Sequence, residues 1–171
     1  PQNIEQISTV LQIAVRNNLS VVPRGGGTKL NIGNYPAKLD IVLCMSEMDK
    51  IIEMHPADMT IRVQAGTKME SIKRSLIKEG QLLPLTSPLE SRATIGGTVS
   101  ANVSGYHNLI YGTSRDLVIG TKFVQANGTV AKSGGNVVRN VTGYDLNKLF
   151  IGAIWILGLL AEISLKVITL P

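Results

Sequence analysis

Cysteine, histidine and aromatic residues are scarce in this sequence. Cys44 is the single cysteine, so no disulfide can form within the chain, and a reducing, cytoplasmic location is predicted. The two histidines are isolated and no Cys-x-x-Cys spacing occurs, so we expect no metal site. Aromatic residues make up 4% of the chain and the basic residues are scattered, which argues against nucleic-acid binding.

Long hydrophobic runs are also missing. The most apolar stretch, residues 149–161, is shorter than the ~20 residues that a membrane-spanning helix needs, so no transmembrane segment is expected. We interpret this stretch as buried core. No signal peptide is visible. With 44% hydrophobic and 17% charged residues, the chain has the material for one domain or for two small lobes that share a ligand.

The first half of the chain has the pattern of a small α/β lobe ending at about residue 85. Apolar residues recur at helical spacing in two segments, with Thr67 as the expected N-cap of the second helix and Gly80 as its stop. Short apolar or alternating runs predict strands between them. The expected helices are 4–18 and 69–77, and the expected strands are 21–22, 39–43 and 59–65.

The second half, about 86–171, has the pattern of a larger, mainly antiparallel β lobe with helices. Asn127-Gly128 is a strong hairpin turn signal between strands expected at 117–125 and 129–132. A closing strand is expected at 159–167. The predicted fold class is therefore α+β, or α/β in two lobes. The two further expected helices are a short one at 98–101 and another at 143–150.

Glycine, in contrast, is abundant, with 17 residues in several clusters. The first cluster, Gly25-Gly26-Gly27, follows a predicted strand, where free backbone N–H groups can form a nest for a phosphate. Arg24 and Lys29 can add positive charge, although a flexible surface turn is the simpler alternative. Neither Gly-x-Gly-x-x-Gly nor a Walker loop is present. Several such clusters in two lobes favour a long ligand that is anionic in its middle, such as a dinucleotide.

An ordered series of motifs resembles one known family. The motifs are Pro23-Arg-Gly-Gly-Gly-Thr-Lys29, Ala93-Thr-Ile-Gly-Gly97, Asn102 to Gly105, Tyr111-Gly112, Arg115-Asp116 and Asn140-Val-Thr-Gly-Tyr-Asp-Leu146. Together they resemble the FAD-binding PCMH-type (vanillyl-alcohol-oxidase-type) domain over nearly the whole chain. Within it, the likeness is to the FAD-binding subunits of glycolate oxidase, E before D, and to D-lactate dehydrogenase-like FAD-linked oxidases.

The resemblance implies a two-lobed fold that holds FAD in the seam. The glycine loop would bind the pyrophosphate, and other motif residues would follow the ribityl chain, the flavin ring and the adenine. Thr28 stands where some relatives carry a histidine linked to the flavin, so noncovalent FAD is expected. The implied cofactor-binding residues are Arg24, Gly25, Gly26, Gly27, Thr28, Lys29, Thr94, Ile95, Gly96, Gly97, Ala101, Asn102, Gly105, Tyr111, Gly112 and Ile163; no catalytic residue is assigned.

One segment departs from the family pattern. After Phe-Ile-Gly the family continues with Ser-Glu-Gly-Thr-Leu-Gly, whereas this chain has Ala153-Ile-Trp-Ile-Leu-Gly158. A polar, turn-forming segment has become bulky and apolar. Two alternatives are open for Trp155: it packs on a partner subunit, or it occupies cofactor space.

The function implied by the resemblance is that of an FAD-linked oxidoreductase that takes a hydride from a 2-hydroxy acid such as glycolate or D-lactate. We expect this chain alone to be inactive, because the substrate cap domain of related enzymes is absent from it. The implied partners are that C-terminal domain, or the flavin and iron–sulfur subunits of an oxidase complex that could bring the protein to a membrane. The alternatives are a noncatalytic assembly module and, more weakly, an enzyme such as UDP-N-acetylmuramate dehydrogenase.

Overall fold

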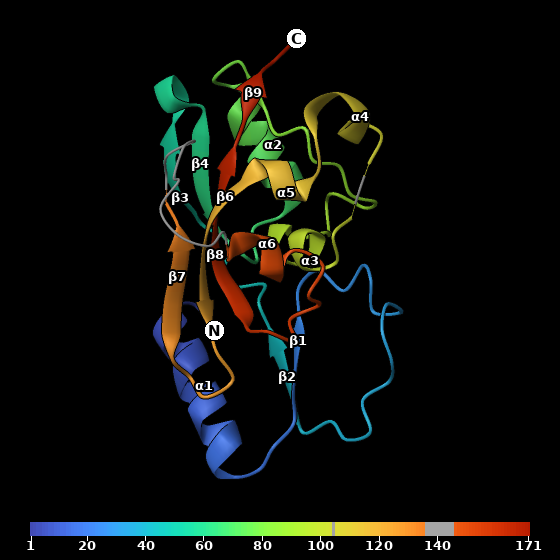
Figure 1. The fold of residues 1–171 in the computed structure, drawn as a ribbon, viewed down its shortest axis with the longest axis vertical. Coiled ribbons are helices and arrows are strands. Elements are labelled where there is room, and N and C mark those ends of the chain that lie inside the picture. The colour runs from blue at the N-terminus through green and yellow to red at the C-terminus, as the bar shows by residue number, and fades with distance from the viewer. Residues whose placement is uncertain (104, 136–145) are drawn as a thin grey trace.

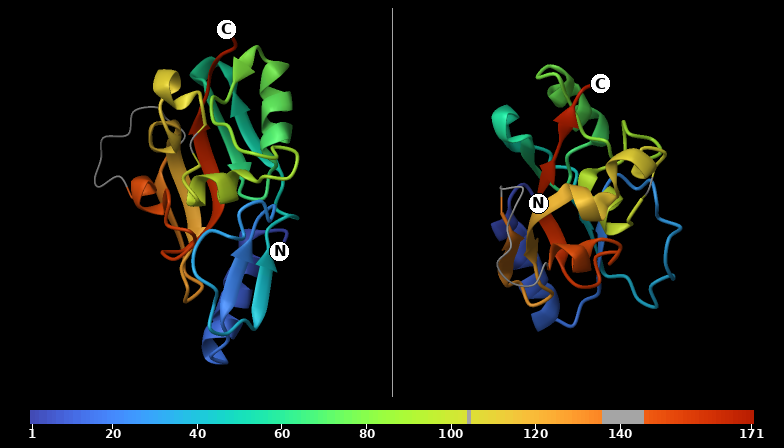
Figure 2. Two further views of the ribbon diagram at one scale, coloured as in Figure 1. Left: turned by 90° about the vertical axis from the view of Figure 1, so that its right-hand side faces the viewer. Right: turned by 45° about the horizontal axis from the view of Figure 1, so that its top comes forward.

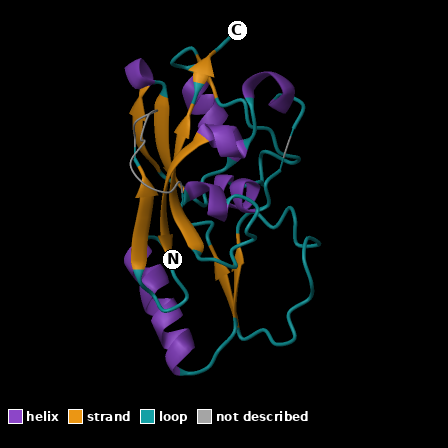
Figure 3. Cartoon of the chain, viewed as in Figure 1, coloured by secondary structure: helices purple, strands orange, loops and turns teal. Residues whose placement is uncertain are grey.

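The computed structural model describes residues 1–103, 105–135 and 146–171, and within them the strands form three sheets (Figures 1 and 3). The helices are α1 (Ile4–Arg16), η1 (Pro56–Asp58), α2 (Met69–Ile77), α3 (Ile95–Ser100), α4 (Asn108–Tyr111), α5 (Ser114–Leu117) and α6 (Asn147–Phe150). The strands are β1 (Val21–Arg24), β2 (Ile41–Cys44), β3 (Ile51–His55), β4 (Thr60–Gln64), β5 (Gln81–Leu82), β6 (Val118–Val124), β7 (Val130–Gly134), β8 (Leu159–Lys166) and β9 (Ile168–Thr169).

Helix α1 and the parallel pair β1–β2 form a small N-terminal unit at the lower end of the molecule in Figure 1. The side chain of Asn3 caps the helix by accepting a hydrogen bond from the Gln6 N–H (2.9 Å). Ile7 and Leu11 point into the core at helical spacing. Because β1 and β2 are parallel, the chain must cross back between them, and it does so through the long loop 25–40 rather than a helix.

The larger unit is built on a five-stranded antiparallel sheet in the order β3-β4-β8-β6-β7. Helix α3 packs against its central strand β8, while α5 and α6 contact β6. The predicted β6–β7 hairpin is confirmed, and residues 125–129 connect its strands, with Gly128 at φ +85°. The expected α+β class with a mainly antiparallel second part is confirmed as well.

The lobe division predicted at about residue 85 does not coincide with the division between sheets. Strands β3 and β4 precede that residue, yet β4 pairs with β8 near the end of the chain, with Ile61 opposite Leu165. The parallel unit therefore ends with β2. Figure 2 shows the five-stranded sheet continuing above this unit with α2 beside it.

Three sequence expectations about local structure are wrong. Thr67 is not the N-cap of α2: Lys68 is, without a side-chain cap, and the Met69 and Glu70 N–H groups donate to carbonyls of the 90–93 segment. Cys44, interpreted beside its apolar neighbours as a core residue, is exposed. The 149–161 stretch is not buried throughout, since Ile156 is 84% exposed. In the described ranges, no helix has the length and apolarity to cross a membrane.

Candidate functional site

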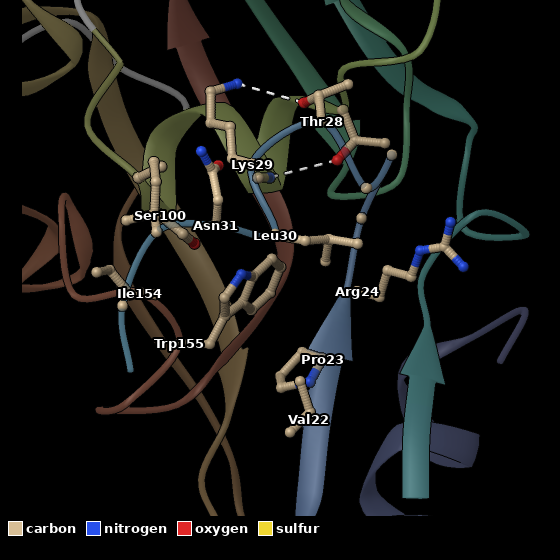
Figure 4. A pocket seen from close by; sticks show the side chains of 18 of the residues that line it. Val22, Pro23, Arg24, Thr28, Lys29, Leu30, Asn31, Ser100, Ile154 and Trp155 are labelled. Atoms are coloured by element: carbon tan, nitrogen blue, oxygen red, sulfur yellow. Dashed lines mark hydrogen bonds between the residues drawn. The ribbon is translucent and has the colours of Figure 1, made fainter. Parts of the chain in front are cut away.

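A cavity of about 520 Å³ lies between the loop after β1 and helix α3 (Figure 4). Three segments that are far apart in the sequence line it: residues 22–36, Thr94 with one face of α3, and residues 154–156. The structure thus brings nine of the predicted cofactor-binding residues to one place. They are Arg24, Gly25, Gly26, Gly27, Thr28, Lys29, Thr94, Gly97 and Ala101.

The first two glycines of the loop pack directly against the segment before α3. A Cβ atom at Gly26 would overlap the carbonyl oxygen of Arg92, and one at Gly25 would overlap the hydroxyl of Thr94. These glycines are therefore required for the contact between the loop and the second glycine motif. This packing role adds to the role in phosphate binding that the sequence predicts.

The backbone amides of the loop are free to bind a ligand. Within the described parts of the chain, the N–H groups of residues 25–29 donate to no protein acceptor. Gly27 has a φ of +68°, a left-handed conformation that glycine adopts without strain. Five consecutive unpaired amides at the wall of a cavity are typical of an anion-binding nest. In Figure 4 the Arg24 side chain extends away from Trp155, on the other side of β1.

Lys29 adds a positive charge to the same loop. Its Nζ donates to the Ser87 hydroxyl (2.9 Å) and to the Thr28 hydroxyl (3.4 Å), which holds the chain across the loop. Partial burial lowers the pKa of Lys29 from its ordinary value, because desolvation disfavours the charged form. An anionic group bound beside it would oppose that shift and favour the charged amine.

Helix α3 contributes hydroxyl groups to the opposite wall. Thr94 caps the helix by accepting from the Gly97 N–H (3.3 Å). The Ser100 hydroxyl is buried at the cavity and has no hydrogen-bond partner among the described residues. This hydroxyl is closed to solvent, so Ser100 contributes to the cavity wall through its other atoms. The free amides of residues 25–29 fit the acceptor-rich diphosphate of FAD.

The remaining predicted residues are not part of the cavity wall. Ile163 is fully buried in β8, and Gly105 and Gly112 are packed closely against Thr86 and Asp116. Their role toward the cofactor stays a prediction. This set consists of Ile95, Gly96, Asn102, Gly105, Tyr111, Gly112 and Ile163. Most of the Asn140–Leu146 motif, 140–145, lies outside the described residues, as does Ser104.

Sequence reasoning missed two parts of the wall. One is the continuation of the glycine loop, residues 30–36, whose side chains follow no recognisable motif. The other is Ser100, which lies one residue before a predicted site residue. The structure places the half-buried side chain of Trp155 at the wall of this cavity.

The fold, the free loop amides and the cavity beside them define a domain of the kind that binds a nucleotide cofactor. The chain belongs to the FAD binding domain family, whose sequence model matches residues 1–134. This match confirms the resemblance to PCMH-type FAD-binding domains, and FAD is the cofactor of the family.

Sequence relatives are similar over the whole chain. Glycolate oxidase subunit GlcD of Bacillus subtilis is 35% identical over 171 residues, which cover all of this chain and 36% of that protein. D-2-hydroxyglutarate dehydrogenase of Xanthomonas citri is 30% identical over 171 residues and likewise covered to 36%. The mitochondrial D-2-hydroxyglutarate dehydrogenase of Rattus norvegicus is 32% identical over 165 residues, 96% of this chain and 31% of that protein. The chain thus spans about a third of the length of these relatives.

Solved structures have the same fold. Alkyldihydroxyacetonephosphate synthase superimposes with a TM-score of 0.85 at 23% identity, over all of this chain and 31% of that chain. The likeness at this identity shows the fold alone.

The glycolate oxidase relative is a D-type subunit, whereas the sequence motifs favoured the E subunit before it.

Proposed function

We propose that this chain supplies the FAD-binding part of a flavin-dependent oxidoreductase that acts on a 2-hydroxy acid. The relatives support the reaction class, since glycolate and D-2-hydroxyglutarate each carry a hydroxyl group on the carbon next to a carboxylate. FAD, when bound, accepts a hydride from such a carbon. The protein has to hold the cofactor, orient it and exclude water from it.

The observation that carries this proposal is the row of unpaired N–H groups at residues 25–29, beside the cavity. In our proposal these amides bind the diphosphate of FAD, and the Lys29 amine adds its charge to the same group. FAD is held without a covalent bond, so denaturation with acid should release it into the supernatant.

We further propose that the substrate-facing groups come from outside this chain, either from a C-terminal cap domain or from a partner subunit. The relatives are about three times as long as this chain, which supports a substrate site shared with further protein. On this proposal the chain alone binds FAD and turns over no 2-hydroxy acid. The glycolate oxidase relative is a subunit, which supports a partner subunit in an oxidase complex.

A charge placed in the loop tests the role of the amides. We expect Thr28→Asp to weaken FAD binding at least tenfold, about 1.4 kcal/mol, because its carboxylate repels the diphosphate and competes for Lys29. The asparagine of Thr28→Asn has nearly the same shape as aspartate but carries no charge. The affinity of this variant for FAD should therefore stay within about threefold of the wild-type value. Isothermal titration of each purified variant with FAD measures the difference.

Two controls make the result decisive. The loss caused by Thr28→Asp should shrink at high salt, since screening weakens the repulsion of partly exposed charges. Far-UV circular dichroism should be unchanged for both variants. Equal FAD affinity for the aspartate and asparagine variants would show that the diphosphate does not lie at this loop. Absence of FAD binding by the folded protein, with and without the Trp155 side chain, would reject the proposed function itself.

A further inference from the structure

Trp155, the single tryptophan of the chain, lines the cavity beside the second glycine motif. Its side chain lies at the cavity together with those of Pro23 and Leu30 (Figure 4). On the side of α3, the indole packs close to Gly96: a Cβ atom there would be 3.1 Å from its Cη2 atom. The ring therefore lies beside α3 at the wall of the cavity.

The backbone at this point is in a conformation that bulky residues rarely adopt. Ile154 has a φ of +47° and Trp155 a φ of +66°, in the left-handed region that favours glycine. Hydrogen bonds to α3 fix the segment, with the Gly152 N–H donating to the Val99 carbonyl and the Ile154 N–H to that of Ser100 (3.0 Å). Backbone strain that the surroundings maintain is concentrated at ligand-binding sites.

We propose that Trp155 is a plug that narrows the cofactor cavity and sets the FAD affinity of this chain. The inference rests on the function proposed above, because it concerns the same cavity. The indole takes up room in the cavity that the amides of residues 25–29 line, and a dinucleotide would have to reach those amides. A bound dinucleotide has to displace this ring or share the cavity with it, and either costs affinity.

Removal of the ring should therefore strengthen cofactor binding. We expect Trp155→Gly to bind FAD at least tenfold more tightly than the wild type, because it opens the cavity and relieves the strained φ. Trp155→Ala opens the same space and replaces the glycine variant in this test if the glycine variant does not fold. Trp155→Phe, with a smaller ring, should give an intermediate affinity. Isothermal titration with FAD gives the dissociation constants without any enzyme assay.

Leu157→Gly is the matched control, since this residue is 53% exposed in the same segment and does not line the cavity. It should leave FAD affinity unchanged. If the Trp155 variants bind FAD no more tightly than the wild type, the plug is rejected while the proposed function stands. If folded wild-type protein and folded Trp155 variants all fail to bind FAD, both proposals are rejected.

Discussion

At the scale of single residues, the glycine loop shows how one residue type can serve two purposes. Gly27 has the positive φ that lets the loop turn, whereas Gly25 and Gly26 touch the segment that begins the second motif. The sequence predicts free amides in such a run, and the structure agrees. It could not predict the packing role, because the contact joins residues nearly seventy positions apart.

A methyl group at Gly26 should therefore destabilise the fold itself. We expect Gly26→Ala to lower the free energy of unfolding by about 3 kcal/mol or more, since its Cβ would overlap a backbone carbonyl that cannot move alone. Gly97→Ala is the control, because its Cβ would meet only the Thr94 hydroxyl at 3.2 Å. It should cost about 1 kcal/mol or less. Urea denaturation measures the free energy of unfolding of both variants. Equal losses for Gly26→Ala and Gly97→Ala would contradict the packing role of Gly26.

At the scale of secondary-structure elements, the sequence predicted the periodic segments and missed the short or irregular ones. Helices α1 and α2, strand β4 and the β6–β7 hairpin have clear periodicity or turn chemistry, and the structure confirms them. Strand β3 begins with two adjacent isoleucines and is mostly half-buried or exposed, so no alternation marks it. This strand is stabilised by its antiparallel pairing with β4, which the local sequence does not indicate.

The N-terminus of α2 is likewise determined by contacts with a segment that is distant in the sequence. The first N–H groups of a helix need acceptors, and the sequence offers Thr67 for that purpose. The chain instead supplies the Ala93 carbonyl for Met69 and the Glu90 carbonyl for Glu70. Thr67 is then buried, with its hydroxyl donating to the Lys50 carbonyl (3.3 Å). A cap that comes from a distant segment cannot be predicted from residues beside the helix.

Helix α5 begins with a capping box that fixes the turn at Tyr111 and Gly112. Asp116 Oδ2 accepts from the Thr113 N–H (2.8 Å) and hydroxyl (3.0 Å), and its Cβ lies against Gly112. The hydrogen bonds to the Thr113 backbone and side chain lower the pKa of Asp116. A lowered pKa in the folded state means that the unfolded chain binds the proton more tightly, so the stabilisation exists at neutral pH and disappears in acid.

Asp116→Asn should accordingly lose stability at neutral pH by about 0.5–1 kcal/mol. The difference in free energy of unfolding between the wild type and Asp116→Asn should be constant above the ordinary aspartate pKa, about 3.9. It should narrow as the pH falls through the lowered pKa of Asp116 in the folded state. Urea denaturation from pH 7 to about pH 3 tests this. Asp49→Asn, at an exposed residue without a hydrogen-bond or ion-pair partner in the described ranges, is the control. A difference that grows in acid would contradict the assignment.

At the scale of the whole molecule, the cavity joins the two units of the fold. Its glycine loop leaves the parallel sheet of the N-terminal unit, whereas α3 packs on β8 in the centre of the five-stranded sheet. The sequence predicted a ligand held between two lobes and found nine of the cavity residues through motifs. It could not predict the wall formed by residues 30–36, and it left two alternatives open for Trp155, because only the folded chain brings these segments together.

A ligand in this cavity should stabilise both units at once. FAD at one hundred times its dissociation constant should raise the free energy of unfolding by about 2.7 kcal/mol. For a chain of this size that corresponds to an increase of about 5–10 °C in melting temperature. Thermal unfolding can be followed by far-UV circular dichroism, which reports all elements, and by the emission of Trp155, which reports the cavity.

On the proposed binding mode FAD contacts both units, so the two signals should shift together and keep a single transition. The Thr28→Asp variant is the control for specificity: with tenfold weaker binding, the same FAD concentration should stabilise it by about 1.4 kcal/mol, roughly half the wild-type effect. A shift in Trp155 emission with an unchanged circular dichroism transition would mean that the ligand stabilises the cavity segment alone. The cavity would then bind its ligand without coupling the parallel unit to the five-stranded sheet.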